Sequence, residues 1–140
     1  MGPAMHNDKL RKTRLLIAED DPTNRKIFNL MFIRSKFDVD FAEDGQKAVE
    51  MWEKGGYDAI LMDVQMPRLD GFAATGVIRE REQAHGGHTP IIAMTAHAMK
   101  EDEERCLAAG MDAHISKPID FKKCFETIGE VLAQRGQQVC

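Results

Sequence analysis

Short apolar runs alternate with helix-length amphipathic segments five times along the chain. The expected strands are residues 14–19, 37–42, 57–62, 90–95 and 112–116. Strands that alternate with helices are typical of βαβ units, in which the strands lie parallel in one sheet. The pattern therefore predicts an α/β fold with a five-stranded parallel sheet between layers of helices.

The polarity of the strands separates interior strands from edge strands. Residues 15–18, 59–62 and 91–94 are apolar throughout, which is typical of strands covered on both faces. Residues 37–41 and 113–116 alternate between apolar and polar side chains, which indicates one solvent-facing side. We expect the second and fifth strands to be the edges of the sheet.

Capping residues mark the starts of several expected helices. Asp21-Pro22 reads as an N-cap followed by proline at the first helical position, and Asp44 and Asp120 are the expected N-caps of the second and fifth helices. The first helix is predicted from the i, i+3, i+4 spacing of three apolar residues, Ile27, Leu30 and Met31.

The fourth expected helix, about residues 97–109, differs from the others. Its middle, KEDEERC, contains few apolar side chains that could anchor it to a core. We expect this helix to be the least firmly packed and a candidate moving part.

Length and composition limit the class of protein. The chain has 140 residues, of which 43% are hydrophobic and 30% charged, the balance of one globular domain. A net charge of −4 without a stripe of Lys or Arg argues against nucleic-acid binding. No apolar run approaches the roughly 20 residues of a membrane span, so we expect no membrane contact by this domain.

The N-terminus and the cysteines indicate the compartment. The first residues lack the apolar core of a signal peptide, and the three cysteines lack metal or redox spacing. We therefore expect a cytoplasmic domain, whose parent chain can still be membrane-anchored. The expected domain is 14–134, preceded by a disordered segment, 1–13, that can contain a cloning remnant, and followed by a tail, 135–140.

Chemically active side chains follow four of the expected strands. Glu19 and Asp20 end the first strand, Asp63 the third and Thr95 the fourth, and Lys117 follows the fifth. Because the carboxyl ends of parallel strands share one edge, these side chains should meet there. Clustered carboxylates favour a cation such as Mg²⁺, and a carboxylate in such a site can act as a nucleophile toward phosphorus. A hydroxyl and an ammonium would stabilise the phosphoryl oxygens.

Each of these residues also has a plainer interpretation when taken alone. Asp63 can be a turn or helix cap, Glu19 and Asp20 can be capping and solvated charge, Thr95 can be present for its β-propensity, and Lys117 can be solvated. The hypothesis of a site depends on all of them sharing one edge.

Four segments together resemble response-regulator receiver domains. They are LLIAEDDPTNR, ILMDVQMPRLDG, IIAMTA and LAAGMDAHISKPI, and the resemblance extends over about residues 14–132. The chain is most similar to the receivers attached to hybrid sensor histidine kinases. The resemblance implies a flavodoxin-like (βα)5 sandwich with strand order 2-1-3-4-5.

The resemblance also implies roles for individual residues at the metal site. Asp63 is the expected phosphoacceptor. Asp20, Asp63 and the backbone carbonyl of Gln65 are the expected ligands of Mg²⁺, with Glu19 acting mainly through water and Mn²⁺ as an alternative ion.

Further roles concern the phosphoryl group and the switch. Thr95 matches the switch hydroxyl, Lys117 the phosphate-contacting lysine, and the Lys117-Pro118 bond is expected to be cis. His114 stands where the family usually has an aromatic switch residue, and as a titratable group it can alternatively be a half-exposed histidine without a switching role. Two positions are expected to set the dephosphorylation rate, Gln65 and His97.

The function implied is transfer of a phosphoryl group from a phosphohistidine to Asp63. The donor would be a histidine kinase or a histidine phosphotransfer (Hpt) protein, and the change would be read on the surface of the fourth helix, fifth strand and fifth helix. Such a domain catalyses its own phosphorylation and dephosphorylation without being a turnover enzyme, although the parent chain can be a histidine kinase. We expect a module of a hybrid kinase, with a homodimer as a further option.

Alternative functions remain at this point. The chain can be a stand-alone response regulator or a pseudo-receiver that only binds a partner. A flavin-binding protein with the same sheet would need a phosphate-cradling loop after the first strand, where this chain has the acidic EDDPTN. An aspartate-based phosphatase would carry its nucleophile after the first strand, whereas Asp63 follows the third.

Overall fold

The computed structural model describes residues 12–66, 68–96 and 99–139. It contains one parallel sheet in the order β2-β1-β3-β4-β5. The strands are β1 Thr13–Ala18, β2 Phe37–Ala42, β3 Ala59–Asp63, β4 Ile91–Thr95 and β5 Ala113–Ser116. The expected fold, strand order and edge strands are therefore confirmed, and β1, β3 and β4 are the interior strands.

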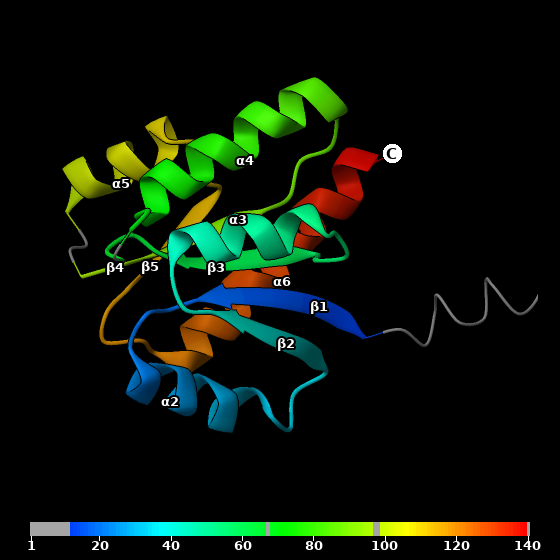
Figure 1. Ribbon diagram of the computed structural model, residues 1–140. Helices are drawn as coiled ribbons and strands as arrows, with labels where there is room; N and C mark the ends of the chain where they lie inside the picture. The colour runs from blue at the N-terminus through cyan, green and yellow to red at the C-terminus, as the bar shows by residue number, and fades with distance from the viewer. Residues whose placement is uncertain (1–11, 67, 97–98, 140) are drawn as a thin grey trace, which may run out of the picture.

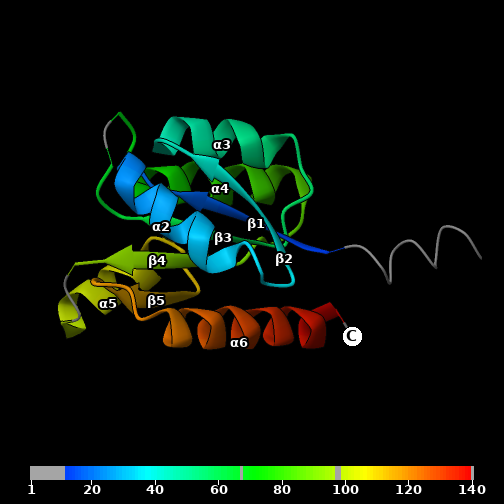
Figure 2. The ribbon, with the colours of Figure 1, turned by 90° about the horizontal axis from the view of Figure 1, so that it is seen from below.

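Helices cover both faces of the sheet (Figure 1). They are α2 Pro22–Phe32, α3 Gly45–Glu53, α4 Gly71–His85, α5 Lys100–Ala108 and α6 Phe121–Val139. The helices α3, α4 and α5 lie on one face and α2 and α6 on the other, with α6 alongside the β5 edge (Figure 2). Helix α6 continues to Val139, past the position at which the sequence was expected to become a tail.

The core forms two layers that share the central strands. Along β1, Leu16 and Ala18 belong to the layer under α3, α4 and α5, whereas Leu15 and Ile17 belong to the layer under α2 and α6. All four side chains are fully buried. Successive residues of a strand point to opposite faces, so an uninterrupted apolar run serves both layers.

The apolar stripe from which the first helix was predicted does not face the core. Helix α2 is present, but Ile27, Leu30 and Met31 are exposed, and the buried residues are Phe28 and Phe32. The reason is a cluster of aromatic rings in the layer between α2, α6 and β2. Ring centroids lie 5.4 Å apart for Phe28–Phe121, 4.7 Å for Phe32–Phe125 and 6.3 Å for Phe32–Phe37.

The predicted N-caps are present as hydrogen bonds. The carboxylates of Asp21, Asp44 and Asp120 accept from backbone N–H groups in the first turns of α2, α3 and α6. Asp70 caps α4 in the same way, through the N–H of Ala73 at 2.8 Å. Each cap satisfies a donor that the helix itself leaves without a partner.

Helix α5 buries fewer of its residues than α2, α3 or α4. Met99 at its N-cap makes no side-chain capping bond, and within the helix only Cys106 is buried. This agrees with the scarcity of apolar residues in its sequence. No helix in the described parts of the chain is both long enough and apolar enough to cross a membrane.

Candidate functional site

Asp63 ends the central strand β3 as a buried carboxylate with two defined donors. Its side chain is 2% exposed. Lys117 Nζ donates to Oδ2 at 2.6 Å, and the backbone N–H of Gln65 donates to Oδ1 at 3.0 Å. An ionised carboxylate is strongly disfavoured in a core unless it is paired, so these contacts allow the charge to remain there.

The loop after β3 returns directly to the strand end. The N–H of Gly71 donates to the carbonyl of Val64 at 3.2 Å. A Cβ at Gly71 would lie 2.3 Å from the carbonyl oxygen of Asp63, so only glycine permits this approach. The turn-prone residues 68–71, RLDG, thus provide the close return of the backbone to Asp63.

Three carboxylates converge at the carboxyl edge of the sheet. Glu19, Asp20 and Asp63 each offer an oxygen, and these oxygens all lie within 4.8 Å of one another. Glu19 is buried and Asp20 exposed. Burial, and then the charge of Asp63, raise the pKa of the Glu19 carboxyl, while a hydrogen bond from the N–H of Asp21 opposes this.

The donor set of this cluster fits a hard divalent cation. Such ions bind carboxylate oxygens, carbonyls and water, and Mg²⁺ commonly uses one or two carboxylates. Lys117 supplies one positive charge against three carboxylates, so an additional cation would lower their mutual repulsion. The Arg25 guanidinium donates to the backbone carbonyls of Glu19 at 2.9 Å and Asp20 at 3.0 Å.

Thr95 enters the site from the end of β4, and Lys117 enters it from the segment after β5. Thr95 is the last residue of β4 and is 4% exposed. The N–H of Lys117 donates to the Thr95 carbonyl at 2.7 Å, which joins the segment after β5 to the end of β4. The Lys117-Pro118 bond is cis. The side chains that were expected to share one edge therefore lie together.

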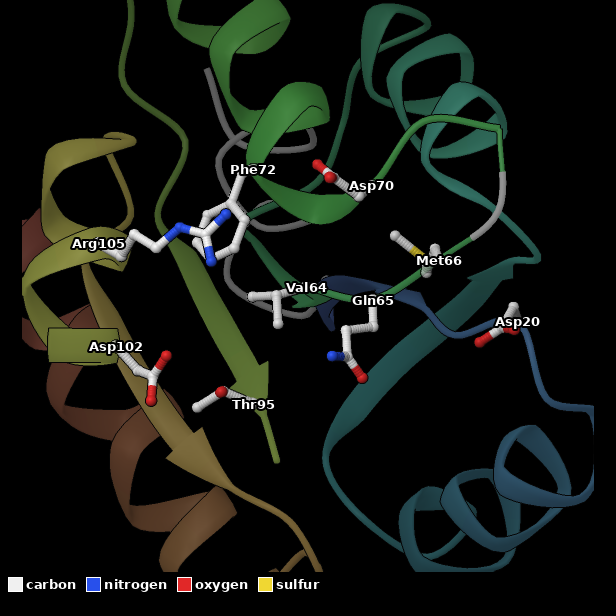
Figure 3. Close-up of a pocket in the computed structure, with 9 residues that line it drawn as sticks. All are labelled: Asp20, Val64, Gln65, Met66, Asp70, Phe72, Thr95, Asp102 and Arg105. Atoms are coloured by element: carbon white, nitrogen blue, oxygen red, sulfur yellow. The ribbon is translucent and has the colours of Figure 1, made fainter. Parts of the chain in front are cut away.

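A cavity of about 520 Å³ opens beside this edge (Figure 3). Asp20, Gln65 and Thr95 contribute to its wall, together with residues of α4 and α5. The sequence did not point to the residues from these two helices, Phe72, Asp102 and Arg105. Arg105 lies over the Phe72 ring, 4.5 Å from its centroid. No local pattern pairs residues of two separate helices, so this contact could not be read from the chain.

Of the two histidines expected to act in the switch or in dephosphorylation, the structure describes His114 but not His97. His114 is half-buried on the edge strand β5 and lines a second hollow of about 530 Å³ beside α6. The His114 side chain is therefore close to the protein surface. His97 lies outside the described residues.

Fold and site together define a class of protein: a five-stranded parallel α/β sandwich with a lysine-paired buried aspartate and an acidic, cation-compatible cluster at the carboxyl edge. Comparison with known proteins gives the family. The model of the response regulator receiver domain matches residues 15–129, and the chain belongs to this family. It is thus a receiver domain of two-component signal transduction.

Three relatives illustrate the similarity. Hybrid signal transduction histidine kinase I of Dictyostelium discoideum is 44% identical over 138 residues, which is 95% of this chain but 8% of that protein. The magnesium-bound receiver domain of a sensor histidine kinase from Pseudomonas aeruginosa PAO1 is 36% identical, with a TM-score of 0.78 over 88% of this chain and 99% of that one. The receiver domain of Ssk1 from Saccharomyces cerevisiae, solved with the histidine phosphotransfer protein Ypd1, is 29% identical, with a TM-score of 0.83 over 90% of this chain and 92% of that one.

Proposed function

We propose that Asp63 accepts a phosphoryl group from a phosphohistidine on a histidine kinase or an Hpt protein. The observation that carries this proposal is the buried Asp63 carboxylate, held between Lys117 Nζ at 2.6 Å and the Gln65 N–H at 3.0 Å. A carboxylate that only caps a turn would have no need of a lysine from the segment after β5. The hybrid kinases among the relatives support a phosphohistidine as the donor.

A divalent cation would be held by Asp20, Asp63 and the Gln65 carbonyl, with Glu19 acting mainly through water. Mg²⁺ is the first candidate, supported by the carboxylate cluster and by the magnesium ion in the cleft of the Pseudomonas receiver, and Mn²⁺ is the alternative. When bound, the ion would supply the positive charge that offsets the carboxylates and the incoming phosphoryl oxygens.

The transfer itself follows from the placement of the side chains. A carboxylate oxygen of Asp63 attacks phosphorus, the P–N bond to the histidine breaks, and the imidazole nitrogen keeps the electron pair of that bond. The product is an aspartyl phosphate. Lys117 and the Thr95 hydroxyl stabilise the charge on the phosphoryl oxygens.

The new group would act as a switch. It adds about −1.5 to −2 charge beside Thr95 and Lys117. Thr95 moves toward the phosphoryl oxygens, which frees space that His114 can enter, and the surface of α5, β5 and α6 changes as one of two states becomes favoured. The scarcity of buried residues in α5 supports its role as the element that moves.

The exposed face of α2 is the proposed docking surface for the protein donor. Ile27, Leu30, Met31 and Ile33 are 44%, 64%, 46% and 66% exposed, an unusual density of apolar side chains on one short helix. An apolar hollow of about 510 Å³ joins Ile27 to the segment that carries Lys117. A donor seated on this face would therefore lie beside the phosphoacceptor site.

Charge indicates the chemistry of that donor surface. Residues 22–36 contain four basic and no acidic side chains in a chain whose net charge is −4. Lys26, Arg34 and Lys36 are exposed. We expect an apolar helix face flanked by acidic residues as the complement, because opposite potentials steer and orient association.

The decisive experiment measures the mass of the intact protein after incubation with phosphoramidate, with and without Mg²⁺. A Mg²⁺-dependent gain of one phosphoryl group that is absent in Asp63→Asn would support the proposal, since asparagine keeps the shape but not the nucleophile. If the folded wild type gains nothing from phosphoramidate or from a phosphorylated donor domain, the chain is a pseudo-receiver that only binds. The sequence of the whole gene product distinguishes a domain of a hybrid kinase, as we propose, from a stand-alone regulator.

A further inference from the structure

The loop between β3 and α4 is tied to the start of α3 by an ion pair. Arg68 in the loop donates to Oδ2 of Asp44 at 3.0 Å. The Asp44 side chain is 7% exposed and that of Arg68 is 75% exposed, so a surface arginine reaches a nearly buried carboxylate. The other carboxylate oxygen, Oδ1, caps α3 through the N–H of Lys47 at 2.8 Å. Asp44 therefore connects the helix start and the loop with one side chain.

The loop backbone is held in a conformation that its own residues do not favour. Arg68 has a φ of 67°, the single positive φ of a non-glycine residue among those that the structure describes. Residues other than glycine rarely adopt this left-handed conformation, so contacts with the surrounding structure must stabilise it at Arg68. One contact is direct: a Cβ at Gly45 would lie 1.8 Å from the carbonyl oxygen of Leu69. The loop thus rests on the first turn of α3.

This anchored segment begins three residues after Gln65. The Gln65 N–H donates to Asp63, and its carbonyl is a proposed metal ligand. The loop leaves β3 at Asp63 and returns to it at Gly71, whose N–H donates to the Val64 carbonyl. Release of Arg68 from Asp44 would free the part of the loop between these two points, and the Gln65 carbonyl could then turn.

We infer that Arg68 and Asp44 are positioning residues for the metal site, and that their ion pair sets the affinity for Mg²⁺ by holding the Gln65 carbonyl in place. This inference rests on the proposed function, which provides the metal site. Groups that orient metal ligands without touching the ion commonly change its affinity strongly when they are lost.

The test is a calorimetric Mg²⁺ titration of the whole chain and three variants. Arg68→Ala and Asp44→Asn each remove the ion pair, and asparagine retains the capping acceptor that α3 needs. Both should weaken Mg²⁺ binding by roughly tenfold. Arg68→Lys keeps a positive charge and should lose less than Arg68→Ala. Tryptophan fluorescence of each variant, from the single Trp52, checks that the fold is intact.

A matched control is available in the same two elements. Arg81 of α4 pairs with Glu53 of α3 at the surface, away from the loop. Arg81→Ala also removes an ion pair between α3 and the segment after β3, but it should leave Mg²⁺ affinity unchanged. A general weakening of the packing between these elements would instead affect the control as well, and that result would overturn the inference.

The outcomes separate this inference from the proposed function. If the wild type binds Mg²⁺ and the folded Arg68→Ala and Asp44→Asn variants bind it equally well, the positioning role is wrong while the metal site stands. If the wild type binds no Mg²⁺, the metal site itself is wrong, and the positioning role is wrong with it.

Discussion

Lys117 Nζ lies 2.6 Å from Oδ2 of Asp63, although the two residues are 54 positions apart in the chain. The Asp63 side chain is 2% exposed and that of Lys117 28%, so the pair stands at the boundary between core and cavity. The lysine stabilises the charge of the resting carboxylate. In the function that we propose, it would also contact a phosphoryl group attached there.

Replacing Lys117 by methionine should destabilise the metal-free protein. The buried Asp63 carboxylate would lose its ammonium partner, which should cost about 2 kcal/mol. The measurement is urea unfolding followed by the fluorescence of Trp52. In the double variant with Asp63→Asn, most of that loss should be recovered because the unpaired charge is gone. Equal stability of Lys117→Met and wild type would contradict the pairing.

Donor docking on α2 can be separated from the chemistry at Asp63. Leu30→Ser, at a side chain that is 64% exposed, should slow phosphorylation by a protein donor by roughly fivefold, because it removes an apolar contact from the docking surface. Its phosphorylation by phosphoramidate should stay unchanged. Leu107→Ser on α5, at 56% exposure, is the matched control. Because α5 belongs to the proposed switch surface, this change should alter both rates by the same factor. Selective slowing with the protein donor by both variants would rule out α2 as a specific docking surface.

Arg79 should be important for stability at the amino-terminal ends of β4 and β5, at the far end of these strands from the candidate site. Its guanidinium donates to the carbonyls of Gly110 and Thr89 and to the carboxylates of Glu82 and Asp112, at 2.7–2.9 Å. Its side chain is 16% exposed. Arg79→Ala leaves these acceptors without that donor and should lower the free energy of unfolding by about 3 kcal/mol.

Arg81→Ala again provides the comparison for Arg79. The pair that Arg81 forms with Glu53 is exposed on both sides, so its loss should change stability by less than about 1 kcal/mol. Urea unfolding of both variants checks the difference. Similar losses would mean that burial of the Arg79 contacts contributes nothing.

Tyr57 should titrate well above an ordinary tyrosine. Burial, and then the hydrogen bond that its hydroxyl donates to Asp40 at 2.7 Å, raise the pKa of Tyr57 from 10.0 to about 12. Because the pKa is higher in the folded state, the stability contributed by this group is complete below pH 10 and is lost as the pH rises toward 12. The chain has one tyrosine, so its ultraviolet absorbance reports this titration directly.

Asp40→Asn tests the cause of the Tyr57 shift. It removes the negative charge beside the hydroxyl while keeping an acceptor, so the pKa should fall below that of the wild type. An unchanged midpoint would assign the whole shift to burial.

Much of the candidate site was predictable because it depends on strand order and strand ends. Uninterrupted apolar runs identified the interior strands, and the polar residues that end them, such as Asp63 and Thr95, had to meet once the strands were parallel. The resemblance to receiver domains added the roles. By contrast, the contact of Arg105 with Phe72 joins two helices that no sequence pattern relates.

Helix α2 shows that local signals decide whether a helix forms, whereas tertiary contacts decide which of its faces is buried. Its N-cap, its proline and its apolar spacing predicted a helix, since these signals act within one turn. Two sets of apolar residues then competed for the core, Ile27 with Leu30, and Phe28 with Phe32. The aromatic rings of α6 and β2 decided this in favour of the phenylalanines, because ring packing depends on complementary surfaces far apart in the chain.

The sequence by itself therefore determined the kinds of elements, their order and the residues at the strand ends. Periodicity, capping and chain connectivity are local properties, which a chain carries in its order of residues. Only the tertiary structure decided which face of α2 is buried, that Arg68 reaches Asp44, and which helices complete the cavity beside Thr95. These are contacts between distant segments, and their geometry exists only after the core has packed.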